Sequence, residues 1–259
     1  MSNLLSNLIE NTNKEKDLLL GICSIDNPLL DSFQDNINKI LPSAKSLIVI
    51  IASHSKGALN SDNNQVKQYD TIYTYERVKE ISMKLTRDLE FEGYNSAAVP
   101  AFIPLDIMSE KRGMKGEICW RTASVASGLG KIGKNNLLIT EPFGSRVRIG
   151  GLITEHPPIN TKSENTQLLK HPKCDSCDNC QKNCPTKALS NYSTNKKLCG
   201  DYIFSYGLRK YSDQMEKIIN ANQEERKKLL RDGTTRELWQ NFMTGCYYYC
   251  WKCQVSCPN

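Results

Sequence analysis

The residues best suited to chemistry in this chain are cysteines that lie in two short runs near its C-terminal end. The first run has the spacing C-x2-C-x2-C-x3-C-P and the second has the spacing C-x2-C-x3-C-P. The first comprises Cys174, Cys177, Cys180 and Cys184, and the second comprises Cys250, Cys253 and Cys257. Thiolates at these spacings hold iron–sulfur clusters, and the last cysteine of such a run ligates the other cluster of a pair. The two runs therefore predict two [4Fe–4S] clusters.

The same rule assigns ligands to each cluster. We expect the first cluster to be held by Cys174, Cys177, Cys180 and Cys257. The second cluster takes Cys184, Cys250, Cys253 and one further cysteine. Cys246 precedes Cys250 by four residues, where a ferredoxin repeat has three, and Cys199 follows Cys184 by fifteen. Spacing alone leaves the choice between Cys199 and Cys246 open.

Two other uses of cysteine, zinc binding and disulfide formation, explain the spacing and position of these residues less well than clusters do. A zinc site needs only two CxxC pairs and gives no reason for a proline after each run. A secreted disulfide framework is suggested by 11 cysteines in 259 residues, but all except Cys23 and Cys119 lie after residue 170. The N-terminal segment has no signal-peptide pattern, and the longest apolar run, 47–52, is too short to span a bilayer. We expect a cytoplasmic protein with reduced thiols and no membrane association.

The length of the chain allows two modest domains, which we place at 1–160 and 161–259. The boundary is a polar segment, 157–172, with Pro157-Pro158 at its start and His171-Pro172 at its end. We expect His156 and His171, which flank it, to be surface residues rather than metal ligands. The net charge of +6 is mild and favours an ordinary basic surface over one that binds RNA.

The first domain has the pattern of an α/β fold. Residues 46–52 form a continuous β-branched and apolar run, typical of a strand buried on both faces. Apolar residues recur at helical spacing between 72 and 89, before Gly93. We expect further strands at 97–102, 137–140 and 146–153, and a helix at 122–125. In the second domain we expect helices at 201–211 and 214–231, with the charged run 224–228 on a solvated face.

A glycine-rich segment, 126–135, precedes the predicted strand at 137–140. Gly128, Gly130 and Gly133 allow a close approach to a planar ligand, or a turn with positive φ. Lys134 and Asn135 offer polar contacts to amide or phosphate groups. Such a turn is also common where no ligand is bound.

This segment, the Phe-Gly-Ser triplet at 143–145 and the strand ending in Leu-Ile-Thr at 152–154 resemble the epoxyqueuosine reductases, whose distant relatives are the reductive dehalogenases. The resemblance covers most of residues 40–259. It implies a nitroreductase-like α/β domain followed by an α-rich, ferredoxin-like domain with two [4Fe–4S] clusters. It also implies that Cys199 is the eighth cluster ligand. It further implies a cobalamin in the first domain, with a flavin as the fallback, held near Gly128, Gly130, Gly133, Lys134, Asn135 and Leu138.

By this resemblance the chain is a reductase whose clusters pass electrons from a ferredoxin- or flavodoxin-type donor to a corrinoid. The alternative is an electron-transfer or corrinoid-servicing protein without an organic substrate of its own. Met114 stands where the family has an aspartate thought to donate a proton, and neither Asp106 nor Glu117 matches that motif. The chain also ends at Asn259 without the helical repeats that many family members use to hold tRNA. We therefore expect a small-molecule or modified-nucleoside substrate and consider tRNA doubtful.

Overall fold

A central antiparallel sheet organises the first part of the chain. The structure is a computed structural model that describes residues 10–12, 14–102, 104, 116–159, 167–245 and 248–258. The sheet has the order β1-β2-β6-β3, and each neighbouring pair is antiparallel. Its strands are β1 (Leu18–Ser24), β2 (Ser46–Ser53), β6 (Val147–Thr154) and β3 (Ser96–Val99). The predicted α/β fold class is confirmed.

The predicted strand at 46–52 is β2, in the interior of the sheet. Leu47, Val49 and Ile51 point to one hydrophobic cluster, and the residues between them point to another. Because successive side chains of a strand alternate between faces, an uninterrupted apolar run requires apolar cover on both sides. The sheet is antiparallel, although such runs are more typical of parallel sheets.

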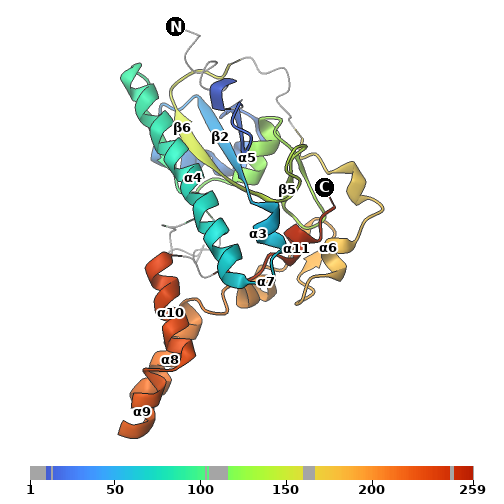
Figure 1. The fold of residues 1–259 in the computed structure, drawn as a ribbon. Helices are drawn as coiled ribbons and strands as arrows, with labels where there is room; N and C mark the ends of the chain where they lie inside the picture. The colour runs from blue at the N-terminus through green and yellow to red at the C-terminus, as the bar shows by residue number, and fades with distance from the viewer. Residues whose placement is uncertain are drawn as a thin grey trace.

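Helices cover both faces of the sheet (Figure 1). α4 (Asn64–Phe91) lies along one face. The other face is covered by η1 (Pro28–Phe33), α2 (Gln34–Ile40), α5 (Trp120–Ala126), β4 (Lys131–Ile132) and β5 (Leu138–Ile139). The short helix α3 (Lys56–Asn60) precedes α4. The predicted helices at 72–89 and 122–125 correspond to α4 and α5, both of which are longer than expected.

Glycines on β6 allow both layers to approach the sheet closely. A Cβ at Gly150 would lie 2.6 Å from Val78 of α4. A Cβ at Gly151, where φ is +156°, would lie 2.0 Å from the Ile48 carbonyl oxygen and 2.9 Å from the Trp120 ring. Since real Cβ atoms do not tolerate such distances, these two positions require glycine.

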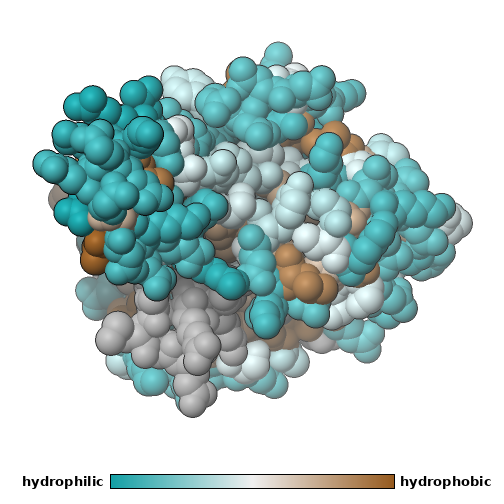
Figure 2. Space-filling view, turned by 90° about the horizontal axis from the view of Figure 1, so that it is seen from below, coloured by the Kyte–Doolittle hydropathy of each residue, from teal (hydrophilic) through white to brown (hydrophobic). Residues whose placement is uncertain are grey.

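The second part of the chain is mostly helical. It contains η2 (Pro172–Cys174), α6 (Asn179–Lys182), β7 (Leu189–Ser190), β8 (Ser193–Thr194), α7 (Lys196–Ile203), α8 (Leu208–Asn220), α9 (Gln223–Leu229), α10 (Gly233–Thr244) and α11 (Lys252–Val255). α8, α9 and α10 project away from the sheet (Figure 1). The face seen in Figure 2 is mostly hydrophilic, with hydrophobic side chains in small separate groups. No helix in the described ranges is long and apolar enough to cross a membrane.

Three details of the predictions were wrong. The expected helix at 201–211 is interrupted between Ile203 and Leu208. The expected helix at 214–231 is divided at 221–222, because the Asn222 side chain caps a new helix by accepting from the Glu225 N–H. His156 is buried rather than exposed, and its ring packs 4.6 Å from that of Tyr94.

Candidate functional site: two cysteine-lined cavities

The cysteines of the two runs gather around two small cavities. One cavity is lined by Cys174, Cys177, Cys180 and Cys257. The other is lined by Cys184, Cys199, Cys250 and Cys253. Each cavity thus takes cysteines from both runs, as the predicted ligand sets require. Cys199 lines the second cavity, whereas Cys246 lies outside the described residues.

Packing between two short helices explains why distant runs meet. α6, which follows the first CxxC turn, packs against α11, which lies within the second run. Each run therefore places its first cysteines at one cavity and its last cysteine at the other. No disulfide joins any of the described cysteines, so the donors are thiols.

The donor set fits a cluster better than a single ion. A zinc ion needs its sulfurs about 2.3 Å away, which draws four of them around one point. Four thiols around a cavity, in the two-run spacing, are instead the arrangement that a cubane requires.

Burial and hydrogen bonds set the acidity of these thiols. Burial raises the pKa of Cys253 to about 12 and also raises the pKa values of Cys174 and Cys180. Burial also opposes ionisation of Cys184, but hydrogen bonds from the Thr186 hydroxyl and nearby backbone N–H groups outweigh it and lower its pKa. The Ala188 N–H donates to the Cys184 Sγ at 3.3 Å. Binding of a metal cluster would therefore release protons from most of these thiols.

The glycine-rich segment lies against the first cysteine cavity. Ile132 of β4 accepts from the His171 N–H at 2.8 Å, which ties the segment to the start of the cysteine region. Lys134 donates to the Asp175 carbonyl oxygen at 3.2 Å and to the Asp178 carboxylate at 2.9 Å. The hydrogen bond with Asp178 raises the pKa of Lys134, so the ammonium stays charged at neutral pH.

A further residue of this segment, Asn135, also faces the cysteines. Asn135 donates to the Cys253 carbonyl oxygen at 3.3 Å, and with Lys134 it lines the first cavity. Lys134 and Asn135 thus connect the sheet to the cysteine turns.

The glycines of this segment are explained by packing. A Cβ at Gly130 would lie 2.6 Å from the Ile139 carbonyl oxygen, and one at Gly133 would lie 2.6 Å from the Ile139 side chain. Gly128 has a φ of +76°, a conformation that favours glycine. Leu138 is fully buried in the core. None of these four residues lines the apolar cavity beside α4.

That cavity, of about 390 Å³, lies between α4 and the segment that follows β3. Its wall is mainly apolar and includes Ile72, Met83 and Pro100. The rings of Tyr75 and Phe102, which also line it, stack with centroids 4.8 Å apart. Its size and lining are typical of a small-molecule site. Sequence patterns do not reveal this cavity, because its residues come from a helix and a loop whose apolar pattern indicates only core packing.

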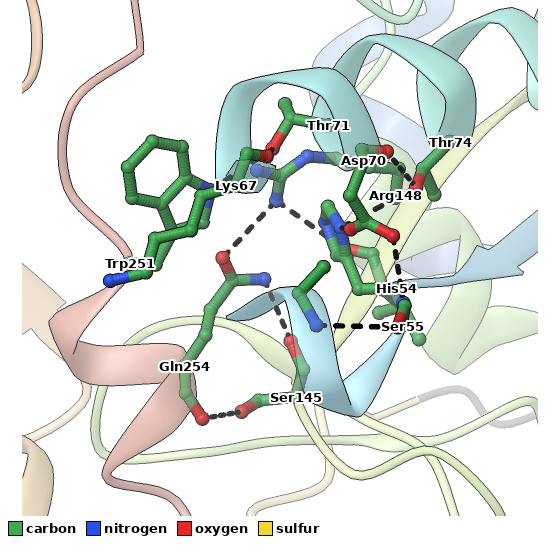
Figure 3. A network of polar contacts seen from close by, with 12 residues as sticks. His54, Ser55, Lys67, Asp70, Thr71, Thr74, Ser145, Arg148, Trp251 and Gln254 are labelled. Carbon is green, nitrogen blue, oxygen red and sulfur yellow. Dashed lines mark hydrogen bonds and ion pairs between the residues drawn. The ribbon is translucent and has the colours of Figure 1, made fainter. Parts of the chain in front are cut away.

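A buried polar network joins the sheet to the second cysteine run (Figure 3). Arg148 of β6 donates to the Gln254 side chain at 3.4 Å, and Gln254 donates to the Ser145 carbonyl oxygen at 2.9 Å. His54 and Asp70 form a pair of 2.5 Å in the same network. Burial and the Arg148 charge lower the pKa of His54 to about 4, so its imidazole is neutral at pH 7.

Known proteins share part of this sequence. No protein-family profile matches the chain. The chain is 31% identical over 144 residues to the epoxyqueuosine reductase of Listeria monocytogenes, a match that covers 55% of this chain and 30% of that protein. It is 25% identical over 154 residues to the tetrachloroethene reductive dehalogenase of Dehalobacter restrictus, covering 60% of this chain and 25% of that protein.

Solved structures of an epoxyqueuosine reductase and a reductive dehalogenase share the fold of this chain. The epoxyqueuosine reductase of Bacillus subtilis superposes with a TM-score of 0.59 at 19% identity, over 99% of this chain and 65% of that one. The predicted resemblance to the epoxyqueuosine reductases is confirmed. A catabolic reductive dehalogenase shares the fold more distantly, with a TM-score of 0.52 at 15% identity, over 71% of this chain and 27% of that one. The chain matches less than half of the length of these two curated relatives.

Proposed function

We propose that this chain is an iron–sulfur reductase in which two [4Fe–4S] clusters pass electrons to a corrinoid bound in the sheet domain. The observation that carries the proposal is the division of eight cysteines between two cavities, four at each. Each cluster supplies one electron at a time. The protein's own contribution is to hold the two clusters side by side, through the packing of α6 against α11.

The relatives support the corrinoid. One of the related dehalogenase structures is described in terms of B12-dependent dehalogenation. A corrinoid, when bound, would supply a cobalt centre that accepts single electrons and reacts with an organic substrate. Of the residues predicted to hold it, Lys134 and Asn135 line the first cysteine cavity. Gly128, Gly130, Gly133 and Leu138 belong to the same segment, 128–138. The apolar cavity beside Tyr75 is the second place where an organic group fits.

A corrinoid-binding experiment separates the reductase from a protein that only transfers electrons, although a corrinoid-servicing protein would bind the corrinoid as well. Anaerobically prepared protein should bind hydroxocobalamin with a change in its visible spectrum, whereas an electron-transfer protein should not. Met83→Trp, at the exposed rim of the cavity, should weaken binding at least tenfold if the cavity holds the corrinoid. Phe91→Trp, an exposed position on the same helix, is the matched control. If neither hydroxocobalamin nor a flavin binds at micromolar concentration, the electron-transfer function replaces the reductase.

Lys134 provides a second prediction, for the first cluster. Lys134→Met removes the hydrogen bonds to Asp175 and Asp178, which hold the loop between Cys174 and Cys180. We expect a chelator to strip the first cluster several-fold faster, with little change at the second cluster. Lys131→Met, which changes an exposed neighbour, should behave as wild type. Equal rates of loss in the Lys134 variant and the wild type would show that this contact does not stabilise the site.

A further inference from the structure

Arg148 occupies an unusual position for a charged residue. It lies on β6 and is only 7% exposed. Its guanidinium stands 5.1 Å from the ring centroid of Tyr75 on α4 and 5.0 Å from that of Tyr248, two residues before Cys250. Cation–π contacts of this kind favour arginine and strengthen when they are shielded from water. The two rings therefore fix a cation between the sheet and the second cysteine run.

The contacts of Arg148 reach both ends of the Cys250–Cys253 turn. Tyr248 precedes the turn, and Gln254, whose side chain accepts from Arg148, follows it. Gln254 is 2% exposed and also exchanges hydrogen bonds with Ser145 through its side-chain NH₂ and its carbonyl oxygen. A single side chain of the sheet thus contacts the residues that flank two of the four thiols of the second cavity.

The charges in this network are separated in space. Asp70 accepts from the Ser55 N–H at 2.9 Å and pairs with His54, on the side of the network away from Trp251 and Gln254 (Figure 3). Lys67 lies over the Trp251 ring at 5.7 Å, on the other side. The positive groups therefore face the cysteine turn, and the carboxylate faces the start of α3.

We propose that Arg148 is the positioning residue of the second cluster, which orders the Cys250–Cys253 turn and raises the reduction potential of the cluster held there. This inference rests on the proposed function, since it requires a cluster at Cys184, Cys199, Cys250 and Cys253. Reduction adds one negative charge to a cluster, and a nearby cation stabilises that charge. Net charge, hydrogen bonding and solvent exposure are the properties by which a protein sets such potentials. A buried cation acts more strongly than an exposed one because solvent and salt screen it less.

The test is a potentiometric titration followed by EPR on anaerobically reconstituted protein, with wild type, Arg148→Met, Arg148→Lys and Arg87→Met. Arg148→Met removes the charge with little change in volume, and Arg148→Lys keeps the charge without the planar group. Arg87→Met removes an exposed charge from α4 and serves as the control. A Cys184→Ser protein, which lacks a ligand of the second cluster, identifies the signal of that cluster. Iron content is measured in each sample.

We expect Arg148→Met to lower the ratio of reduced to oxidised second cluster about tenfold at a fixed potential, a midpoint shift of about 59 mV for one electron. Arg148→Lys should shift it less, and the first cluster and Arg87→Met should not change. Loss of the second cluster alone from Arg148→Met, with retention in Arg148→Lys, would also support the role. Unchanged potentials in both Arg148 variants, with both clusters present, would overturn it. Wild type that holds no second cluster would instead refute the proposed function.

Discussion

Cys199→Ser protein, reconstituted anaerobically, should lose its second cluster or retain it only as a three-iron, oxygen-labile form. Cys199 lines the second cavity with Cys184, Cys250 and Cys253, so its replacement leaves three thiolates for four irons. The iron content should fall from about eight per chain toward four, and the EPR signal of the first cluster should persist. Iron analysis and EPR on the same sample measure both quantities.

Cys246→Ser is the matched comparison, because spacing alone left Cys246 as the rival ligand. We expect this variant to keep both EPR signals and its full iron content. The reverse pattern, with intact clusters in Cys199→Ser and a damaged second cluster in Cys246→Ser, would assign the ligand to the C-x3-C spacing at Cys246–Cys250.

The second large expected effect is on the rate of substrate turnover. We expect the reduced protein, supplied with cobalamin, to turn over epoxyqueuosine-containing tRNA about 10²–10⁴-fold more slowly than an epoxyqueuosine reductase of the kind it resembles. Removal of the epoxide oxygen needs a proton, and a positioned general acid is worth about that factor in rate. By the resemblance, Met114 stands at the position of the family's aspartate, and a methionine cannot donate a proton. Met114 and Asp106 both lie outside the described residues.

A variant that restores the missing acid tests this prediction further. Met114→Asp should raise turnover, whereas Met243→Asp, which adds a carboxylate at an exposed position on α10, should not. Wild-type turnover equal to that of the related reductase would refute the prediction. A loss of that turnover in Asp106→Asn or Glu117→Gln would then identify the acid that replaces the family's aspartate.

The parts of the fold that the sequence could predict are those with a strong local pattern. The apolar run of β2 can be buried only between two apolar layers, and the periodic face of α4 requires a sheet beneath it. The cysteine spacing assigned seven of the eight thiols that line the two cavities, because four ligands must reach each cluster whatever the surrounding fold. The eighth, Cys199, was implied only by the resemblance to the epoxyqueuosine reductases. Helix limits were less predictable, since the interruption at 204–207 depends on packing between distant segments.

Sequence patterns could not predict the polar network around Arg148. The alternation of polar and apolar residues in β6 does not show what covers Arg148, whose buried side chain lies between Tyr75 and Tyr248, from elements far apart in the chain. One signal was present: Thr71 and Thr74 interrupt the apolar face of α4 and are both fully buried. Buried polar residues on such a face indicate that something polar packs there.

The role of the glycine-rich segment was hard to predict because its glycines fit both ligand binding and close packing. Gly130 and Gly133 suit either a ligand or a tightly packed hairpin. The Ile139 carbonyl oxygen shows that close packing is sufficient to require glycine at 130, whereas a Cβ at 133 would meet the ends of the Ile139 and Asn135 side chains. Lys134 and Asn135 contact the cysteine turns, so their polar groups already have partners within the protein.

The most direct test of the central claim is the metal content of the wild-type chain. Protein reconstituted anaerobically with iron and sulfide should contain about eight irons and eight sulfides, and its reduced form should give the EPR signals of two [4Fe–4S] clusters. The cysteine sets around the two cavities predict this value. About four irons per chain, or stoichiometric zinc in protein produced with abundant iron, would contradict the claim.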